Sequence, residues 1–248
     1  MSAISSESIF HFTKFKENLI GILKFEFLPG LSYERYELKN KVIKGYFPMV
    51  SFCDIPLSQI RQHTGKYGHY GIGMSKTWAQ KKALNPVLYI RRRSHLAAHI
   101  EAFSKVLDMG YTPDGKPPEI QKALMSLLRY IKPFEGNYLK GRKTKKPIKF
   151  YDEREVRYVP PPEMTKNRYF LSVHAHEEPK NVETFNQVLR QARLRFEPDD
   201  VRYIIIAKES ETLEIVKAVK DIKDKYDDKI KEMLVTRIIS WEQIKEDF

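Results

Sequence analysis

A segment rich in glycine and aromatic residues, at positions 47–75, constrains the fold of this 248-residue chain more than any other. It begins with an apolar run at residues 47–53, which predicts a short buried strand. A sharp break follows at residues 54–56, where Pro56 pushes Ile55 out of helical conformation. Three glycines follow within six residues, Gly68, Gly71 and Gly73, and they let the backbone approach another segment or a ligand closely. The segment therefore predicts either strand packing in a core or one wall of a binding site.

Two distant segments carry polar residues in strand-like patterns. Residues 8–13 alternate, so His11 and Thr13 point to the same face of a predicted strand. Residues 150–159 also predict a strand, on which alternation puts Glu153 and Glu155 on one face. We interpret these two glutamates as the best acid–base candidates, or as ion-pair partners of neighbouring arginines on an edge strand.

Composition indicates a globular protein with anionic partners. The chain has 44 basic and 32 acidic residues, a net charge of +12, which favours nucleic acid, nucleotides or an acidic protein as partner. No apolar run reaches the roughly 18 residues that a membrane span needs, and the first residues lack a secretory signal pattern. We therefore expect a cytoplasmic protein. The single cysteine, Cys53, excludes an internal disulfide, and no pattern of metal ligands is visible, so no metal is expected.

The most basic short run lies at residues 140–149 and is predicted to be a loop. It is either a solvated loop or a phosphate-contacting one, since clustered cations bind a polyanion by releasing counterions. The residues that we expect to contact nucleic acid are Arg142, Lys143, Lys145 and Lys146.

The order of the remaining patterns predicts one mixed α/β (α+β) domain over residues 1–248. Two helices are expected at residues 94–109 and 118–131, as an insertion of about 94–131 between strands. Residues 31–45 show no clear period and predict a loop with some helix. The last third predicts a helix at 182–196, a strand at 201–207, a helix after Ser210, a strand at 235–240 and a terminal helix.

Several of these segments resemble the AbiGi family, a bacterial abortive-infection family linked to phage resistance. The resemblance rests on FHFT near the start, PMVSFCDIPLSQI, YGIGMSK, NPVLYI and DEREVRY, and it covers residues 4–160 most strongly. AbiGi members are described as the antitoxin partner of a two-component system.

The same order of elements resembles the ADP-ribosyltransferase fold, especially DarT-type enzymes that modify nucleic acid, with a split sheet and a helical insertion. The resemblance implies Glu155 as the catalytic carboxylate, with Glu153 as the alternative. It also implies that NAD is bound as a substrate by His11, Thr13, Ser51, Phe52 and either Tyr67 or Tyr70.

Two functions follow as expectations. The first is an NAD-dependent ADP-ribosyltransferase toxin or effector of phage defence, a glycosyltransferase-class enzyme with RNA or DNA as acceptor. The alternative is an AbiGi-type antitoxin, a non-catalytic module that neutralises a co-encoded partner toxin.

Overall fold

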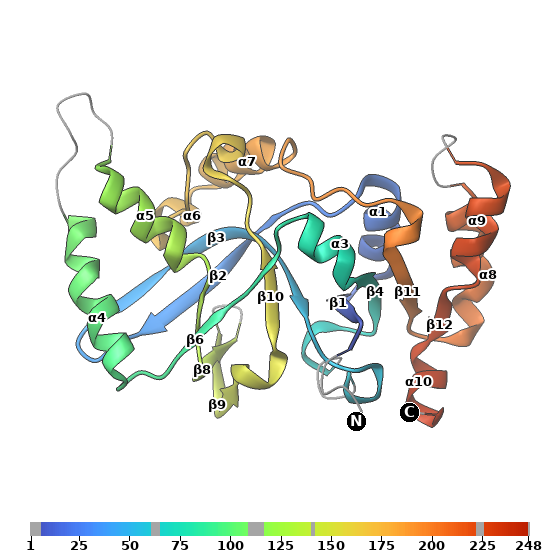
Figure 1. The fold of residues 1–248 in the computed structure, drawn as a ribbon, viewed down its shortest axis with the longest axis horizontal. Coiled ribbons are helices and arrows are strands. Elements are labelled where there is room, and N and C mark those ends of the chain that lie inside the picture. The colour runs from blue at the N-terminus through green and yellow to red at the C-terminus, as the bar shows by residue number, and fades with distance from the viewer. Residues whose placement is uncertain (1–5, 61–64, 109–116, 140–141, 222–225, 248) are drawn as a thin grey trace. The chain divides into compact units, whose positions relative to one another are not determined.

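The computed structural model describes residues 6–60, 65–108, 117–139, 142–221 and 226–247. Its helices and strands form the mixed α/β class that the sequence predicts (Figure 1). Contacts within the chain group it into two compact units. Unit 1 holds residues 1–28, 51–84 and 193–248, and unit 2 holds residues 29–50 and 85–192. The single domain of residues 1–248 stays a prediction.

Unit 1 contains strands from both ends of the chain. Its strands are β1 (Ser8–Thr13), the last residues of β3 (Val42–Cys53), β4 (Tyr70–Ser75), β11 (Val201–Ile206) and β12 (Ile238–Ser240). Its helices are α1 (Lys16–Phe25), α3 (Lys76–Lys81), α8 (Thr212–Lys220), α9 (Asp228–Val235) and α10 (Trp241–Asp247), with 3-10 turns η1 (Leu57–Gln59), η5 (Pro198–Asp200) and η6 (Glu209–Glu211).

The strands of unit 1 pair in the order β12–β11–β4–β1–β3. β4 is antiparallel to both β1 and β11, whereas β11 and β12 are parallel. An aromatic cluster of Phe27, Phe52, Trp78 and Phe196 fills the core beside them, with ring centroids 5.1–5.9 Å apart. Cys53 is buried, as its apolar run predicts.

The glycines of the segment at 47–75 serve close approach between backbone segments. Gly68 has a φ of +112°, and a Cβ added there would lie 2.1 Å from the carbonyl oxygen of Thr13. Gly73 is packed against Phe10 and Tyr203, whose atoms would lie 2.9 Å from its Cβ. The sequence predicts that these glycines let the backbone approach either another segment or a ligand. At Gly68 and Gly73 the structure shows another chain segment.

Replacing Gly68 is expected to destabilise the fold. Gly68→Ala adds a methyl group against backbone atoms and forces alanine into a left-handed conformation, so we expect a loss of about 2 kcal/mol or more in the free energy of unfolding. Gly65→Ala is the matched control, because its Cβ would meet no atom within 4 Å. Chemical denaturation of both variants measures the difference, and equal midpoints would contradict it.

Unit 2 contains a hairpin, short strand pairs and helices. Its strands are the first residues of β3 together with β2 (Gly30–Glu37), β5 (Asn85–Pro86), β6 (Leu88–Ile90), β7 (Ile131–Pro133), β8 (Glu135–Leu139), β9 (Arg142–Lys149) and β10 (Glu155–Tyr158). Its helices are α4 (His95–Ser104), α5 (Glu119–Leu128), α6 (Val173–Glu177) and α7 (Pro179–Leu189), with 3-10 turns η2 (Lys105–Asp108), η3 (Phe150–Glu153) and η4 (Pro162–Thr165).

Helices α4 and α5 pack on the hairpin of β2 and β3. Their core residues Ala97, Ile100, Leu124 and Leu128 share one buried cluster with Tyr36 and Phe47 of the hairpin. Ser94 caps α4, because its hydroxyl accepts a hydrogen bond from the Ala97 amide at 3.1 Å. Ser75 caps α3 in unit 1 in the same way, because its hydroxyl accepts a hydrogen bond from the Trp78 amide at 3.2 Å.

Three predicted elements are wrong in unit 2. Residues 31–45, expected to be a loop, form β2 and the start of β3, whose antiparallel pairing runs from Gly30 with Met49 to Glu37 with Val42. The basic run at 140–149, expected to be a loop, contains β9, which pairs with β8. The expected strand at 150–159 begins as the 3-10 turn η3, and Arg154, with a φ of 43°, separates that turn from β10. Glu153 and Glu155 therefore do not share one face of a strand.

One boundary and one helix also differ from the prediction towards the end of the chain. The helix expected at 182–196 is α7, which ends at Leu189. The sequence reading missed α9, because only a short apolar pattern precedes β12.

Candidate functional site

His11, Ser51 and Phe52, three of the residues predicted to contact NAD, lie together in unit 1. The antiparallel pairing of β1 with β3 places His11 Nδ1 2.8 Å from the carbonyl oxygen of Ser51. The imidazole ring also packs against Phe27 and Phe52, at centroid distances of 5.5 and 5.7 Å. This side chain is therefore held in place by a backbone hydrogen bond and aromatic contacts.

Thr13, Tyr67 and Tyr70 belong to the same unit. Thr13 and Tyr70 are paired across β1 and β4. The Thr13 hydroxyl accepts a hydrogen bond from the Asn18 side-chain amide at 2.8 Å, and the Tyr70 hydroxyl donates one to Glu211 at 2.8 Å. Burial and this hydrogen bond raise the pKa of Tyr70 to about 12. Tyr67 is half-buried, and the NAD-binding role of all these residues stays a prediction.

The two predicted catalytic glutamates lie in unit 2, inside a group of charged side chains that we term the buried charge cluster. Its members are Glu34, Lys132, Glu153, Glu155 and Arg157. They come from β2, β7, η3 and β10, so four separate elements meet there.

Arg157 is the centre of the buried charge cluster and is 0% exposed. Its Nε donates to Glu155 Oε1 at 2.5 Å and its Nη2 donates to Glu34 Oε1 at 2.7 Å. Its Nη1 donates to the carbonyl oxygens of Arg129 and Ile131 at 2.8 and 3.2 Å. One guanidinium thus links β2 and β10 to the segment that ends α5 and begins β7.

Lys132 is the second cation of the cluster. It forms ion pairs with Glu155 and with Glu153, the latter at 3.2 Å. The backbone N–H of Glu155 donates to the Tyr89 hydroxyl at 2.8 Å. Arg154 adopts a left-handed conformation between η3 and β10. Glu153 and Glu155, on either side of it, both contact Lys132 although they do not share one strand face.

Electrostatics keep Glu155 ionised. Burial alone would raise its pKa, but Arg157 and Lys132 outweigh burial and hold the pKa of this carboxyl well below its usual range. Burial alone would lower the pKa of Arg157, but the carboxylates of Glu155 and Glu34 hold it above its usual range. Burial raises the pKa of Glu34, which has Arg157 as its cation.

The cluster is suited to holding elements together. Glu155 is 4% exposed, and each of its two oxygens faces a cation. A carboxylate held this way is a fixed negative charge with a low pKa and is a poor proton acceptor near neutral pH. Its role as a catalytic residue stays a prediction.

The basic residues predicted to contact nucleic acid lie on β9. Lys143, Lys145 and Lys146 are exposed, and the side chain of Arg142 lies outside the described residues. Among the side chains that the structure describes, no three His, Cys, Asp or Glu residues are placed to hold a metal ion. No helix in the described part of the chain is long and apolar enough to cross a membrane.

Sequence reasoning missed Glu34, Lys132 and Tyr89 as partners of the two glutamates. Glu34 lies in a segment without clear periodicity, and Lys132 lies in a strand of only three residues. No short-range signal connects them to residues 153–157, since the contacts form only when β2, β7 and β10 come together.

The fold and this site define a mixed α/β protein whose predicted catalytic carboxylates are buried in ion pairs. Residues 23–207 match the family model described as "Putative abortive phage resistance protein AbiGi, antitoxin". The chain is also 28% identical over 242 residues to the "Abortive phage resistance protein AbiGi" of Lactococcus lactis subsp. cremoris, covering 88% of this chain and 96% of that relative. The chain therefore belongs to the AbiGi family of abortive phage resistance proteins.

No solved structure matches the chain. The resemblance to the ADP-ribosyltransferase fold accordingly stays a prediction.

Proposed function

We propose that the chain is an antitoxin-type binding module that neutralises a co-encoded toxin by direct contact. The family description supports this function, because it names an antitoxin. The burial and ion pairing of Glu153 and Glu155 are also consistent with a protein that acts by binding and not by chemistry.

The observation that carries the proposal is the outward face of α4 and α5, which we term the helical face. Leu96 and Phe103 of α4 are 40% and 55% exposed, and Ile120 and Leu127 of α5 are 48% and 47% exposed. On each helix the two residues are seven positions apart, so they lie on one side, adjacent to the buried stripe. Each helix thus carries apolar side chains both towards the core and towards solvent.

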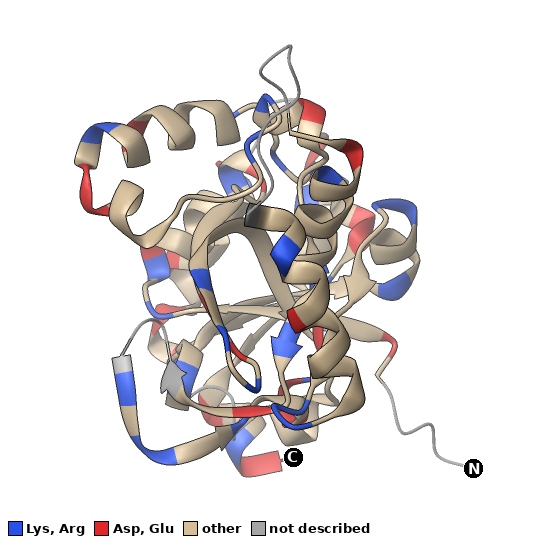
Figure 2. Cartoon of the chain, turned by 90° about the vertical axis from the view of Figure 1, so that its left-hand side faces the viewer, with Lys and Arg blue, Asp and Glu red and all other residues tan. Residues whose placement is uncertain are grey.

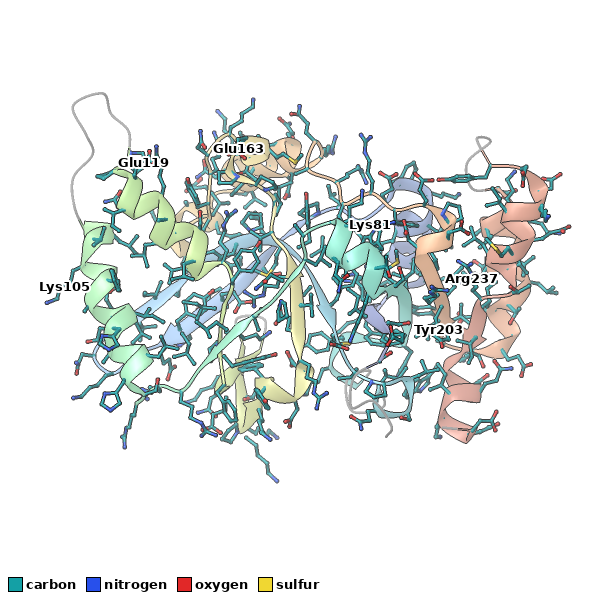
Figure 3. All side chains as sticks on the ribbon, viewed as in Figure 1. Lys81, Lys105, Glu119, Glu163, Tyr203 and Arg237 are labelled. Carbon is teal, nitrogen blue, oxygen red and sulfur yellow. The ribbon has the colours of Figure 1, made fainter. Side chains whose placement is uncertain are left out.

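Few charges interrupt the helical face. α4 contains a single charged residue, Glu101, whose carboxylate accepts from Asn40, and α4 is mostly tan where it faces the viewer in Figure 2. The charged side chains labelled on these elements in Figure 3, Lys105 and Glu119, lie just after α4 and at the start of α5. Clustered exposed apolar residues with charges at their edge are typical of protein–protein contact surfaces.

The occupant that we propose is an acidic toxin that presents apolar side chains to the helical face. Burial of aromatic and aliphatic side chains supplies most of the binding energy in such contacts. The net charge of +12 favours approach of an acidic partner and raises the association rate at low salt.

The test is co-expression with the toxin, scored by growth and by copurification. The double variant Phe103→Glu/Leu127→Glu places two charges in the proposed contact, and we expect binding to weaken by about 100-fold or more, with growth no longer rescued. Leu213→Glu is the matched control, because Leu213 of α8 is an exposed apolar residue of unit 1. Circular dichroism checks that each variant is folded. Full rescue by a folded double variant would contradict the proposal.

NAD-dependent ADP-ribosylation of nucleic acid is the competing function, and it is supported by the meeting of His11 with Ser51 and Phe52. Incubation of the purified chain with labelled NAD and pools of RNA, DNA and protein separates the two. Label transfer that is lost in a folded Glu155→Gln variant would establish the enzyme and overturn the binding module.

A further inference from the structure

We propose that a second surface of unit 2, which we term the stacking surface, binds single-stranded nucleic acid. It consists of two aromatic rings and exposed cations from β9, from η3 and from the residues that directly follow β6 and β7: Phe134, Tyr151, Arg91, Lys143, Lys145, Lys146 and Lys149. This binding activity is separate from the proposed neutralisation of a toxin and uses none of the residues of the helical face.

Two stacked rings form the centre of the stacking surface. Phe134 and Tyr151 have centroids 5.0 Å apart and planes inclined by 22°, and Tyr89 meets Tyr151 edge-on at 5.3 Å. The ring of Tyr151 belongs to a residue that is 49% exposed. A large aromatic side chain left half in water beside a stacked partner offers a π face on which a further planar group can stack.

Backbone hydrogen bonds hold together the segments that carry the two rings, and the rings pack on each other without a ligand. The Tyr151 N–H donates to the Phe134 carbonyl at 3.1 Å, and the Phe134 N–H donates to the Ile90 carbonyl at 2.9 Å. Binding therefore requires little ordering of the rings, and such preorganisation lowers the entropic cost of association.

Cations surround the rings. The Arg91 guanidinium carbon lies 3.8 Å from the Phe134 centroid, and Lys149 Nζ lies 5.9 and 6.0 Å from the Phe134 and Tyr151 centroids. Lys149 also forms an exposed ion pair with Asp152 at 2.9 Å. Cations beside aromatic rings strengthen stacking of bases and attract phosphates at the same position.

β9 extends the positive charge along the chain. Lys143, Lys145 and Lys146 are exposed, and β9 runs directly into η3, which carries Tyr151. The exposed acidic residues next to this segment are Asp152 and Glu135, and Glu135 is paired with Lys149 across β8 and β9. Exposed cations therefore outnumber exposed carboxylates on the stacking surface, and this excess of positive charge favours binding of a phosphate backbone.

The combination selects single strands among anionic partners. Unpaired bases expose π faces that stack on aromatic side chains, whereas a duplex offers its phosphates but keeps its bases stacked internally. An acidic protein can pair with the lysines but supplies no base to stack on the exposed ring of Tyr151.

Fluorescence anisotropy with labelled oligonucleotides of about 12 nucleotides tests this. The probes are single-stranded RNA, single-stranded DNA of the same sequence and the corresponding DNA duplex. We expect both single strands to bind more tightly than the duplex at equal salt. Tyr151→Ala is expected to weaken single-strand binding by roughly 5- to 100-fold, as loss of one stacked base does, and to leave duplex binding unchanged.

Charge reversal on β9 tests the electrostatic part. Lys145→Glu/Lys146→Glu is expected to weaken the binding of all three probes. For single strands it is expected to reduce the magnitude of the slope of log affinity against log salt by about 1.4 or more. The matched controls in unit 1 are Phe15→Ala and the adjacent exposed pair Lys81→Glu/Lys82→Glu, which are expected to bind as the unaltered chain does.

Two results overturn the proposal. One is equal affinity for single strands and duplex with no effect of Tyr151→Ala, which identifies a non-specific polyanion contact. The other is no binding of any oligonucleotide at low salt. Neither result bears on toxin neutralisation, which is read out with the variants of the helical face.

Discussion

Arg157→Met is expected to lower the free energy of unfolding by about 3–5 kcal/mol. The change keeps most of the side-chain volume but removes the cation that pairs with Glu34 and Glu155. It also leaves the carbonyl oxygens of Arg129 and Ile131 without their donor. Buried carboxylates without a cation and buried carbonyls without a donor both favour the unfolded chain.

Urea denaturation followed by circular dichroism measures this loss. Arg190→Met is the matched control, because Arg190 is exposed at the end of α7 and its replacement is expected to change stability by less than about 0.5 kcal/mol. An Arg157→Met variant as stable as the control would show that the buried charge cluster does not hold unit 2 together. If the variant does not accumulate, Arg157→Lys keeps one charge and is expected to recover part of the stability.

Glu155→Gln is expected to lower the free energy of unfolding by about 3 kcal/mol at pH 7, because it removes the anion that both Arg157 and Lys132 contact. The effect depends on pH in a defined direction. Since the pKa of Glu155 is lowered in the folded chain, its ionised form stabilises the fold at every pH above the ordinary glutamate value of about 4.3. That stabilisation is lost as the pH falls below this value towards the folded-state pKa.

Denaturation of the unaltered chain and of Glu155→Gln at pH 7 and pH 3 checks the direction. The difference between the two proteins is expected to be largest at pH 7 and smaller at pH 3. Glu183→Gln, at an exposed position of α7, is the control and is expected to show no comparable difference. A gap between the unaltered chain and Glu155→Gln that widens at low pH would contradict the lowered pKa.

The sequence predicted those elements that carry short-range signals. Alternation identified β1, the apolar run identified β11, and helical periodicity identified α4 and α5. The mixed α/β class followed from these elements, because apolar periodicity is decided by neighbouring residues.

The hairpin of β2 and β3 was missed because β2 lacks an apolar alternation. The two buried residues of β2 are Glu34 and Tyr36, so a charged residue stands at an interior position and breaks the apolar pattern. The buried charge cluster could likewise be predicted only in part. Glu153 and Glu155 were identified as a charged pair, but their cation Lys132 and the bridging role of Arg157 depend on contacts between distant segments.

Analytical ultracentrifugation of the purified chain mixed with the purified toxin that we propose as its partner tests most directly whether this AbiGi protein acts by binding. We expect the unaltered chain and Glu155→Gln to form the same complex at pH 7, and Phe103→Glu/Leu127→Glu to sediment separately from the toxin. Separate sedimentation of the unaltered chain and the toxin, at concentrations where both are folded, would contradict the proposed function.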